Sequence, residues 1–388
     1  MKFDFLCPTF IRFGNGVLET TGQEACKIGL GRKVLLVTGK SSSKKSGSLK
    51  RVEELLEKEG LQVVLYDQVE QNPSVETVEA GAGVARQAGC DLIVALGGGS
   101  PLDAAKGIAV LAAQGGGLDD YFGTDRASQA LPVIAIPTTA GTGSEVTRYA
   151  VITDWKSRQK RTVASFLICP RIAIVDPLLT VTMPKQITAN TGMDALSHAV
   201  EGYLSLKSQP ITDLLAIESI RLVANYLPRA VGQPEDLEAR EKVMYASLLA
   251  GLVINQTRTG IIHGLGYELT LNYQIPHGLA NALLMPQVME FNRISCPEKM
   301  VQIARALGEN VAGLSAREAG RRTAFAVKEL SIDLGMPENA AEAGLRIEDI
   351  KGFAQNFVQT KRSFGAAPRY PDIKEVEEIY LKSFRGEI

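Results

Sequence analysis

The chain has 388 residues, more than one ordinary domain holds, so two domains are expected. Its 42 basic and 43 acidic residues nearly balance and form no block of one sign, which argues against a nucleic-acid or anionic-membrane partner. Five scattered cysteines without a C-x-x-C pair, and the lack of an export signal or an apolar run of about 18 residues, predict a cytoplasmic protein with neither a disulfide framework nor a membrane segment.

Short apolar runs alternate with helical patterns in the first half of the chain. Unalternating, β-branched runs of this kind are typical of buried parallel strands. The predicted strands cover residues 33–38, 62–66, 91–96, 132–136 and 171–176. The helical patterns between the first three strands end on Gly60 and Gly89, as helix C-caps do, so the pattern predicts repeated β-α-β units.

After Asp176-Pro177 the chain shows helical periodicity without intervening strand runs. We therefore expect an α/β domain over residues 1–180 and an all-helical domain over residues 181–388. Four prolines are expected at helix starts and stops, namely Pro228, Pro234, Pro276 and Pro286.

A glycine loop, GGGSPLDAAK (97–106), directly follows the third predicted strand and opens a helix. Ser100 suits the N-cap and Pro101 the first helical position, while Asp103 suits the capping acid rather than a ligand-binding role. The glycines would let backbone N–H groups approach a pyrophosphate at the helix N-terminus. Taken alone, the motif also fits an ordinary strand-to-helix turn.

A second loop, PTTAGTGSE (137–145), follows the next strand and offers the hydroxyls of Thr138 and Thr139 beside flexible glycines. Alone it fits an ordinary polar loop. Ligands of open α/β sheets bind beyond the carboxyl ends of the strands, so two such loops at successive strand ends favour a dinucleotide.

A third loop, TGKSSSKKSG (38–47), ends the first predicted strand without an acidic residue. An acid there would bind a ribose 2′-hydroxyl and repel a 2′-phosphate, so its absence favours NADP(H). The alternative interpretation is a solvated basic loop.

Only three histidines occur, and all lie in the helical half: His198, His263 and His277. Asp194 lies four residues before His198, on the same helix face, so both side chains could reach one ion. The same spacing also describes a simple helix pair. Three imidazoles and a carboxylate suit divalent iron or zinc rather than calcium or magnesium.

These motifs, together with TGMDALSHAVEGY and the H-x13-HG spacing that ends in PHGLANALLMP, resemble the iron-containing (group III) alcohol dehydrogenases of NADP-binding type. The likeness runs from about residue 5 to about residue 300. It implies a dehydroquinate synthase-like fold, in which a Rossmann-like dinucleotide-binding α/β domain with a parallel sheet precedes an all-helical metal-binding domain.

The resemblance also implies roles for individual residues. It makes Asp194, His198, His263 and His277 the metal ligands and thereby the catalytic set. Cofactor contacts are implied at Gly39, Ser41, Ser42, Asn72, Gly98, Gly99, Ser100, Thr138, Thr139, Thr147 and Lys160. Many NAD-preferring members carry aspartate at the position of Gly39, which again favours NADP(H).

Two departures from the family pattern stand out. Tyr267 replaces a second histidine that many members carry four residues after the first, so a proton relay through that position is in doubt, and packing is its simpler role. The segment KRSFGAAPRY lacks the usual cysteine and asparagine, and no role is assigned to it.

The implied activity is reversible hydride transfer between NADP(H), or alternatively NAD(H), and a primary alcohol or aldehyde, in a homodimer or larger homo-oligomer. Divalent iron, or alternatively zinc, acts as the Lewis acid. A dehydroquinate-synthase-like lyase is a rival, but it needs lysines and arginines around an acidic substrate, and the metal segments contain none. A metal-binding module without turnover is a second rival.

Overall fold

The protein is divided into two compact units in the computed structural model, which describes residues 2–28, 31–124, 126–360 and 365–388. The α/β unit spans Leu6–Thr182. The helical unit combines the segment that ends at Phe5 with Met183–Ile388. Within the helical unit, the side-chain amide of Gln209 donates a hydrogen bond to the carbonyl oxygen of Asp4 at 3.2 Å, which helps to hold the N-terminal segment there.

A six-stranded sheet forms the centre of the α/β unit, and its strand order is β1-β8-β5-β4-β2-β3. All of its paired strands run parallel. The strands are β1 (Phe10–Phe13), β2 (Lys33–Gly39), β3 (Gln62–Val69), β4 (Leu92–Gly97), β5 (Val133–Pro137) and β8 (Ile172–Val175). The five strands predicted from apolar runs are therefore confirmed.

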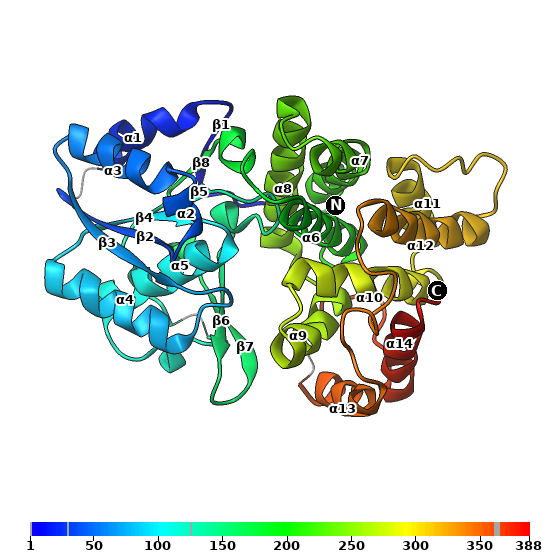
Figure 1. Ribbon diagram of the computed structural model, residues 1–388. Helices are drawn as coiled ribbons and strands as arrows, with labels where there is room; N and C mark the ends of the chain where they lie inside the picture. The colour runs from blue at the N-terminus through cyan, green and yellow to red at the C-terminus, as the bar shows by residue number, and fades with distance from the viewer. Residues whose placement is uncertain (1, 29–30, 125, 361–364) are drawn as a thin grey trace. The chain divides into compact units, whose positions relative to one another are not determined.

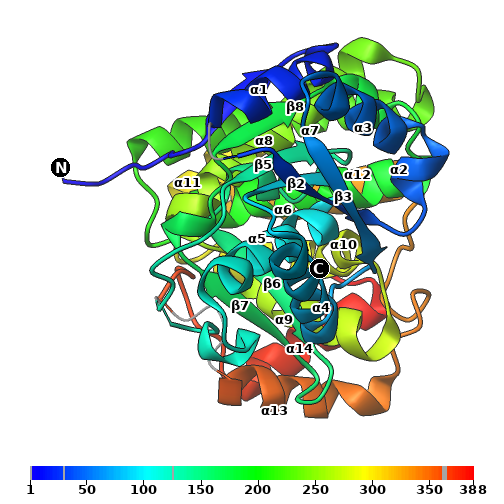
Figure 2. The ribbon, with the colours of Figure 1, turned by 90° about the vertical axis from the view of Figure 1, so that its left-hand side faces the viewer.

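Helices cover both faces of this sheet (Figures 1 and 2), with α1 (Thr21–Ile28) and α3 (Ser48–Lys58) on one face and α4 (Val75–Ala88) and α5 (Gly99–Gln114) on the other. Side chains of β2 alternate between two apolar cores. Leu35 and Val37 pack with α4 and α5, while Val34 and Leu36 pack with α3. Burial on both faces explains why the strand sequences do not alternate between apolar and polar residues.

The carboxyl ends of β2, β4 and β5 meet at one edge of the sheet because the strands are parallel. The predicted cofactor loops therefore begin side by side. The N–H of Thr138 donates to the carbonyl oxygen of Gly97 at 2.9 Å, which joins the loops that follow β4 and β5. Gly97 has a φ of 150°, a backbone conformation that favours glycine.

Three strands were not predicted: β1 and the antiparallel hairpin of β6 (Tyr149–Asp154) and β7 (Gln159–Ala164). β1 is four residues long and lies at the edge of the sheet, with Phe10 exposed. β7 reads QKRTVA, which contains no apolar run. The strand conformation of β1 and β7 therefore depends on pairing with another segment of the chain rather than on a local hydrophobic signal.

The start of α5 differs from the prediction. The helix begins at Gly99, and its N-cap is Gly98, without a side-chain capping bond. The carboxylate of Asp103 instead accepts hydrogen bonds from the hydroxyl of Ser144 at 2.5 Å and the N–H of Val151 at 3.0 Å. The expectation that Asp103 caps the helix is wrong, because this tertiary pairing takes up both of its oxygens.

The helical unit contains no strand in its described residues, which confirms the all-helical prediction. Its helices are α6 (Lys185–Leu204), α7 (Pro210–Gly232), α8 (Leu237–Thr257), α9 (Ile261–Tyr273), α10 (His277–Asn292), α11 (Pro297–Ala306), α12 (Ala316–Asp333), α13 (Ile350–Thr360) and α14 (Ile373–Arg385). No helix in the described part of the chain combines the length and hydropathy needed to cross a membrane.

Two proline predictions are wrong, because Pro228 and Pro286 lie inside α7 and α10. An interior proline costs about 3 kcal/mol of helix stability. Pro286 is buried in α10, which packs against α6, α9 and α12, and tertiary packing of this kind overrides local helix propensity. Pro276, by contrast, is the N-cap of α10, as expected, and Pro234 lies in the turn before α8.

Candidate functional site

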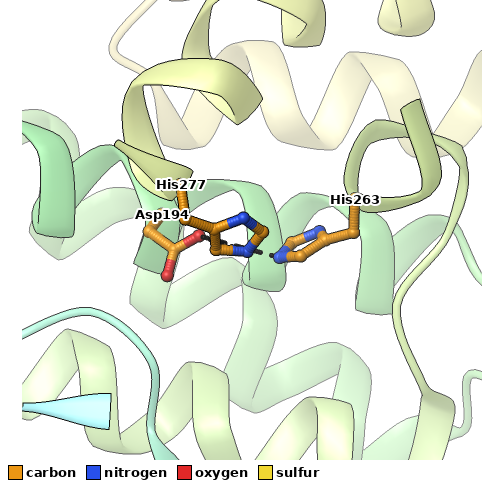
Figure 3. A group of neighbouring side chains, drawn as sticks. All are labelled: Asp194, His263 and His277. Carbon is orange, nitrogen blue, oxygen red and sulfur yellow. Dashed lines mark ion pairs between the residues drawn. The ribbon is translucent and has the colours of Figure 1, made fainter. Parts of the chain in front are cut away.

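The predicted metal ligands come from three helices of the helical unit. Asp194 and His198 lie one turn apart on α6, His263 lies on α9, and His277 is the first residue of α10. Figure 3 shows Asp194, His263 and His277 pointing toward one another. Nε2 of His263 and Nε2 of His277 each lie 3.7 Å from Oδ1 of Asp194.

This cluster fits a divalent metal ion. One donor atom from each of Asp194, His263 and His277 lies within 4.8 Å of the others. Metal–ligand bonds of about 2.1 Å place neighbouring donor atoms about 3.4 Å apart in a tetrahedral site, close to the 3.7 Å observed. Nε2 of His263 is also buried and has no hydrogen-bond partner among the described residues, as expected of a nitrogen that binds a metal ion.

His198 lies beside this group rather than within it. Its ring stacks on that of His263, with centroids 4.4 Å apart and planes inclined by 21°. The structure therefore brings three of the four predicted ligands together by their donor atoms and places the fourth in contact with one of them.

The electrostatics of the cluster favour an ionised carboxylate. Burial alone would raise the pKa of Asp194, but His198, His277 and His263 outweigh burial and hold it well below its usual range. Burial lowers the pKa of His263, whereas the neighbouring Glu201 and Asp194 raise it to about 9. An ionised, buried carboxylate is a suitable ligand for a cation.

Two polar residues beside the cluster were not predicted, Glu201 on α6 and Asn281 on α10. Oε2 of Glu201 lies 2.6 Å from Nδ1 of His263, and the side-chain amide of Asn281 donates to Oδ1 of Asp194 at 2.9 Å. Their spacing could have pointed to them, because Glu201 follows Asp194 by seven residues and Asn281 follows His277 by four. Each thus lies on the same helix face as a ligand candidate.

Gly278 allows α10 to approach α6 at the cluster. A Cβ atom there would stand 1.9 Å from the carbonyl oxygen of Asn190 and 3.2 Å from Cβ of Asp194. The glycine after His277 is therefore required by the close approach of two helices that each carry a metal-ligand candidate.

Tyr267 lies one turn after His263 on α9 and stacks on the ring of His277, with centroids 5.6 Å apart and planes inclined by 15°. Packing against a ligand candidate is thus one function of this side chain. Of the segment KRSFGAAPRY, residues 361–364 lie outside the described residues.

In the α/β unit, the glycines of the loop after β4 lie against the loop after β5. A Cβ atom on Gly98 would stand 3.1 Å from Oγ1 of Thr139, and one on Gly99 would stand 2.6 Å from Cγ2 of Thr142. Loop packing by itself therefore accounts for both glycines. The arrangement also leaves the start of α5 close to the threonine hydroxyls.

Asn72, Ser100 and Lys160 form a connected group at the same edge. The N–H of Asn72 donates to the hydroxyl of Ser100 at 3.3 Å, and Nζ of Lys160 donates to Oδ1 of Asn72 at 2.6 Å. Burial lowers the pKa of Lys160 to about 8, although Asp103 opposes the shift. The structure thus brings together residues separated by up to 88 positions in the chain.

Thr147 is buried, and its hydroxyl accepts a hydrogen bond from Nζ of Lys106 at 3.0 Å. Lys106 is fully buried and also donates to the hydroxyl of Ser144 and the carbonyl oxygen of Tyr149. Lys106 was not predicted as part of the site. Its signal was a single lysine within an otherwise apolar stretch of helix, three residues after Asp103.

Gly39 is the last residue of β2, and Ser41 and Ser42 lie exposed at the start of α2 (Ser42–Lys45). The loop has no acid of its own, but Lys44 forms an ion pair with Asp67 of β3. A Cβ atom on Gly39 would make only ordinary contacts, the nearest at 3.5 Å from the carbonyl oxygen of Val69. Packing therefore does not exclude a larger side chain at this position.

Comparison with known proteins agrees with this architecture. The chain matches the family models described as Iron-containing alcohol dehydrogenase over residues 8–177 and as Fe-containing alcohol dehydrogenase family, C-terminal, over residues 188–384. It is 41% identical to 1,3-propanediol dehydrogenase of Citrobacter freundii, covering 98% of this chain and 99% of the relative. It is 38% identical to NAD-dependent methanol dehydrogenase of Bacillus methanolicus, covering 97% and 98%.

The crystal structure of a 1,3-propanediol oxidoreductase superposes with a TM-score of 0.95 at 39% identity and covers 99% of this chain and 100% of that chain. The predicted fold class, an α/β parallel-sheet domain followed by a helical domain, is thereby confirmed. Sequence, fold and the clustered ligand candidates agree, and the chain belongs to the iron-containing alcohol dehydrogenase family.

Proposed function

We propose that this protein is a metal-dependent oxidoreductase that transfers a hydride reversibly between NADP(H) and a primary alcohol or aldehyde. The observation that carries the proposal is the buried Nε2 of His263, which lacks a hydrogen-bond partner among the described residues and faces Asp194 beside His277. Asp194, His198, His263 and His277 are the proposed ligands. Divalent iron, with zinc as the alternative, would supply Lewis-acid polarisation of the substrate oxygen.

The chain's own groups bind and orient the reactants. Gly98, Gly99 and Ser100 are proposed to receive the pyrophosphate, because N–H groups at the start of α5 lack partners within the helix and a glycine backbone admits close approach. Lys160 and Asn72 form a hydrogen-bonded pair suited to the hydroxyls of the nicotinamide ribose.

The hydroxyls of Thr138 and Thr139 are proposed to contact the cofactor from the loop after β5, and Thr147 belongs to the same loop region. Residues 1–180 would thus carry the cofactor and residues 181–388 the metal. We also propose a cytoplasmic homodimer or larger homo-oligomer.

The preference for NADP(H) rests on Gly39, Ser41 and Ser42. A side chain would fit at Gly39, so steric exclusion does not explain the missing acid, and serine hydroxyls suit a 2′-phosphate. The Bacillus relative is named NAD-dependent, so the choice between the two cofactors is open to test by substitution in this loop.

Gly39→Asp is expected to lower kcat/KM with NADPH by at least about tenfold, since like charges repel by more than about 1.4 kcal/mol at close range. The efficiency with NADH should fall less. A wild type that uses NADH more efficiently than NADPH would overturn this interpretation of the loop.

The proposal of a primary alcohol is supported by two relatives named for 1,3-propanediol and methanol. Steady-state oxidation of NADPH by iron-loaded protein with a panel of small aldehydes tests the activity directly. We expect net NADPH consumption. A metal-binding module would hold iron without turnover, and a dehydroquinate-synthase-like lyase would show no net consumption of the nicotinamide.

A further inference from the structure

Glu201 makes two short contacts with the start of α9, although it belongs to α6. Its Oε1 accepts a hydrogen bond from the N–H of Ile262 at 2.5 Å, and its Oε2 lies 2.6 Å from Nδ1 of His263. The side chain is 5% exposed. Both carboxylate oxygens are therefore committed to consecutive residues of another helix.

The first contact replaces a missing helix cap. The first N–H groups of a helix have no partner within it. The N-cap of α9 is Gly260, which has no side chain to accept a bond. A Cβ atom on Gly260 would stand 2.9 Å from Oε1 of Glu201, so the glycine leaves room for a carboxylate from α6 to accept the bond instead.

The second contact determines which nitrogen of His263 can bind a metal. An ionised carboxylate can only accept hydrogen bonds, so Nδ1 must carry the proton that lies between the two side chains. In the neutral ring that a metal ion binds, the lone pair is then on Nε2, the atom that faces Oδ1 of Asp194 at 3.7 Å. Partners of this kind fix the tautomer and ring orientation of metal-binding histidines.

We infer that Glu201 is a positioning residue that holds His263 with Nε2 directed at the metal, while it caps α9. The inference rests on the proposed metal site. α6 would then provide Asp194 and His198 directly and control His263 on α9 through a third residue on the same helix face.

Glu201→Gln is the sharpest test, because it keeps the shape of the side chain. It leaves only one oxygen to accept from two donors, the N–H of Ile262 and Nδ1–H of His263. If that oxygen accepts from Ile262, the NH2 group faces Nδ1 and drives the proton of His263 to Nε2. If the amide is reversed, its NH2 group opposes the N–H of Ile262. We expect Zn2+ affinity, measured by chelator competition, to fall about 10- to 100-fold.

Glu268→Gln is the matched control. Glu268 is a buried glutamate of α9 that accepts hydrogen bonds from the amides of Asn272 and Asn356. We expect its substitution to leave Zn2+ affinity within about threefold of wild type. The loss of affinity expected for Glu201→Gln comes from its contact with the proposed metal ligand His263.

The second readout is the 15N–1H spectrum of the Zn2+-loaded protein labelled at its three histidines. Wild type should show a slowly exchanging Nδ1–H signal that disappears in His263→Ala, and Glu201→Gln should lose or shift it. An Nε2–H signal for His263 in wild type would overturn the inference even if Glu201→Gln failed to fold.

The outcomes separate the inference from the metal site itself. If wild type bound no Zn2+, or His263→Ala bound it as tightly as wild type, the proposed metal site would fail and the inference with it. If wild type bound one ion and Glu201→Gln retained both its affinity and the Nδ1–H signal, only the role of Glu201 would be refuted.

Discussion

Gly278→Ala is expected to damage the metal site without removing any ligand. The added Cβ would lie 1.9 Å from the carbonyl oxygen of Asn190, whereas real Cβ contacts do not fall below 3.0 Å. The start of α10 must therefore retreat from α6 by at least about 1.1 Å. His277 adjoins Gly278 and would move with it, away from Asp194.

A displacement of this size is several times what a metal site tolerates, because ligand distances must stay within about 0.2 Å of their ideal values. We expect metal affinity to fall at least about 100-fold. Overpacking of this kind also costs about 1–3 kcal/mol of unfolding free energy, so the chain should still fold.

Gly352→Ala provides the control, since Gly352 lies in α13 and an added Cβ meets nothing within 4 Å. This substitution should raise helix stability by up to about 1 kcal/mol and leave metal affinity unchanged. Both variants would be measured by chelator competition and by thermal unfolding of the metal-free protein. Wild-type affinity in a folded Gly278→Ala protein would refute the argument from helix approach.

Three further predictions concern other side chains. Tyr267→Phe should keep metal and cofactor binding and lose at most about tenfold in the hydride step measured by stopped flow, whereas a thousandfold loss would mean that its hydroxyl transfers a proton. Lys106→Met removes the buried donor to the hydroxyls of Ser144 and Thr147. It should lower the free energy of unfolding, measured with urea, by about 3 kcal/mol or more, and an unchanged value would contradict this. Burial raises the pKa of Glu145 to about 7 despite the charge of Lys106, so the native state holds its proton more tightly than the unfolded state does. The free energy of unfolding should thus fall by up to about 3 kcal/mol as pH rises from about 4.5 to 7 and level off above, and Glu145→Gln should remove this slope.

The buried parallel strands could be predicted because their signal is local. β2 and β4 carry continuous apolar runs, and both faces of the sheet are covered. The edge strand β1 and the hairpin strand β7 lack such runs, so their strand conformation depends on pairing partners that the local sequence does not reveal.

The same distinction holds for the candidate site. The histidines and Asp194 stand out by number and spacing, and the glycine loops by composition. Glu201 and Asn281 gain their roles from residues 62 and 87 positions away, respectively, and only the packing of α6, α9 and α10 brings these partners together. Asp103 shows the converse case, since its local pattern indicated a cap and a tertiary contact with Ser144 and Val151 replaced it.

Asp194, His198, His263 and His277 are proposed to bind one divalent ion on which hydride transfer depends. Titration of Fe2+ into chelator-treated protein, with NADPH oxidation by a small aldehyde as the readout, tests it most directly. We expect no activity without metal, a linear rise to a plateau at about one ion per chain, and no recovery in His263→Ala. Full activity of the metal-free protein, or recovery of His263→Ala to the wild-type level at one equivalent, would contradict it.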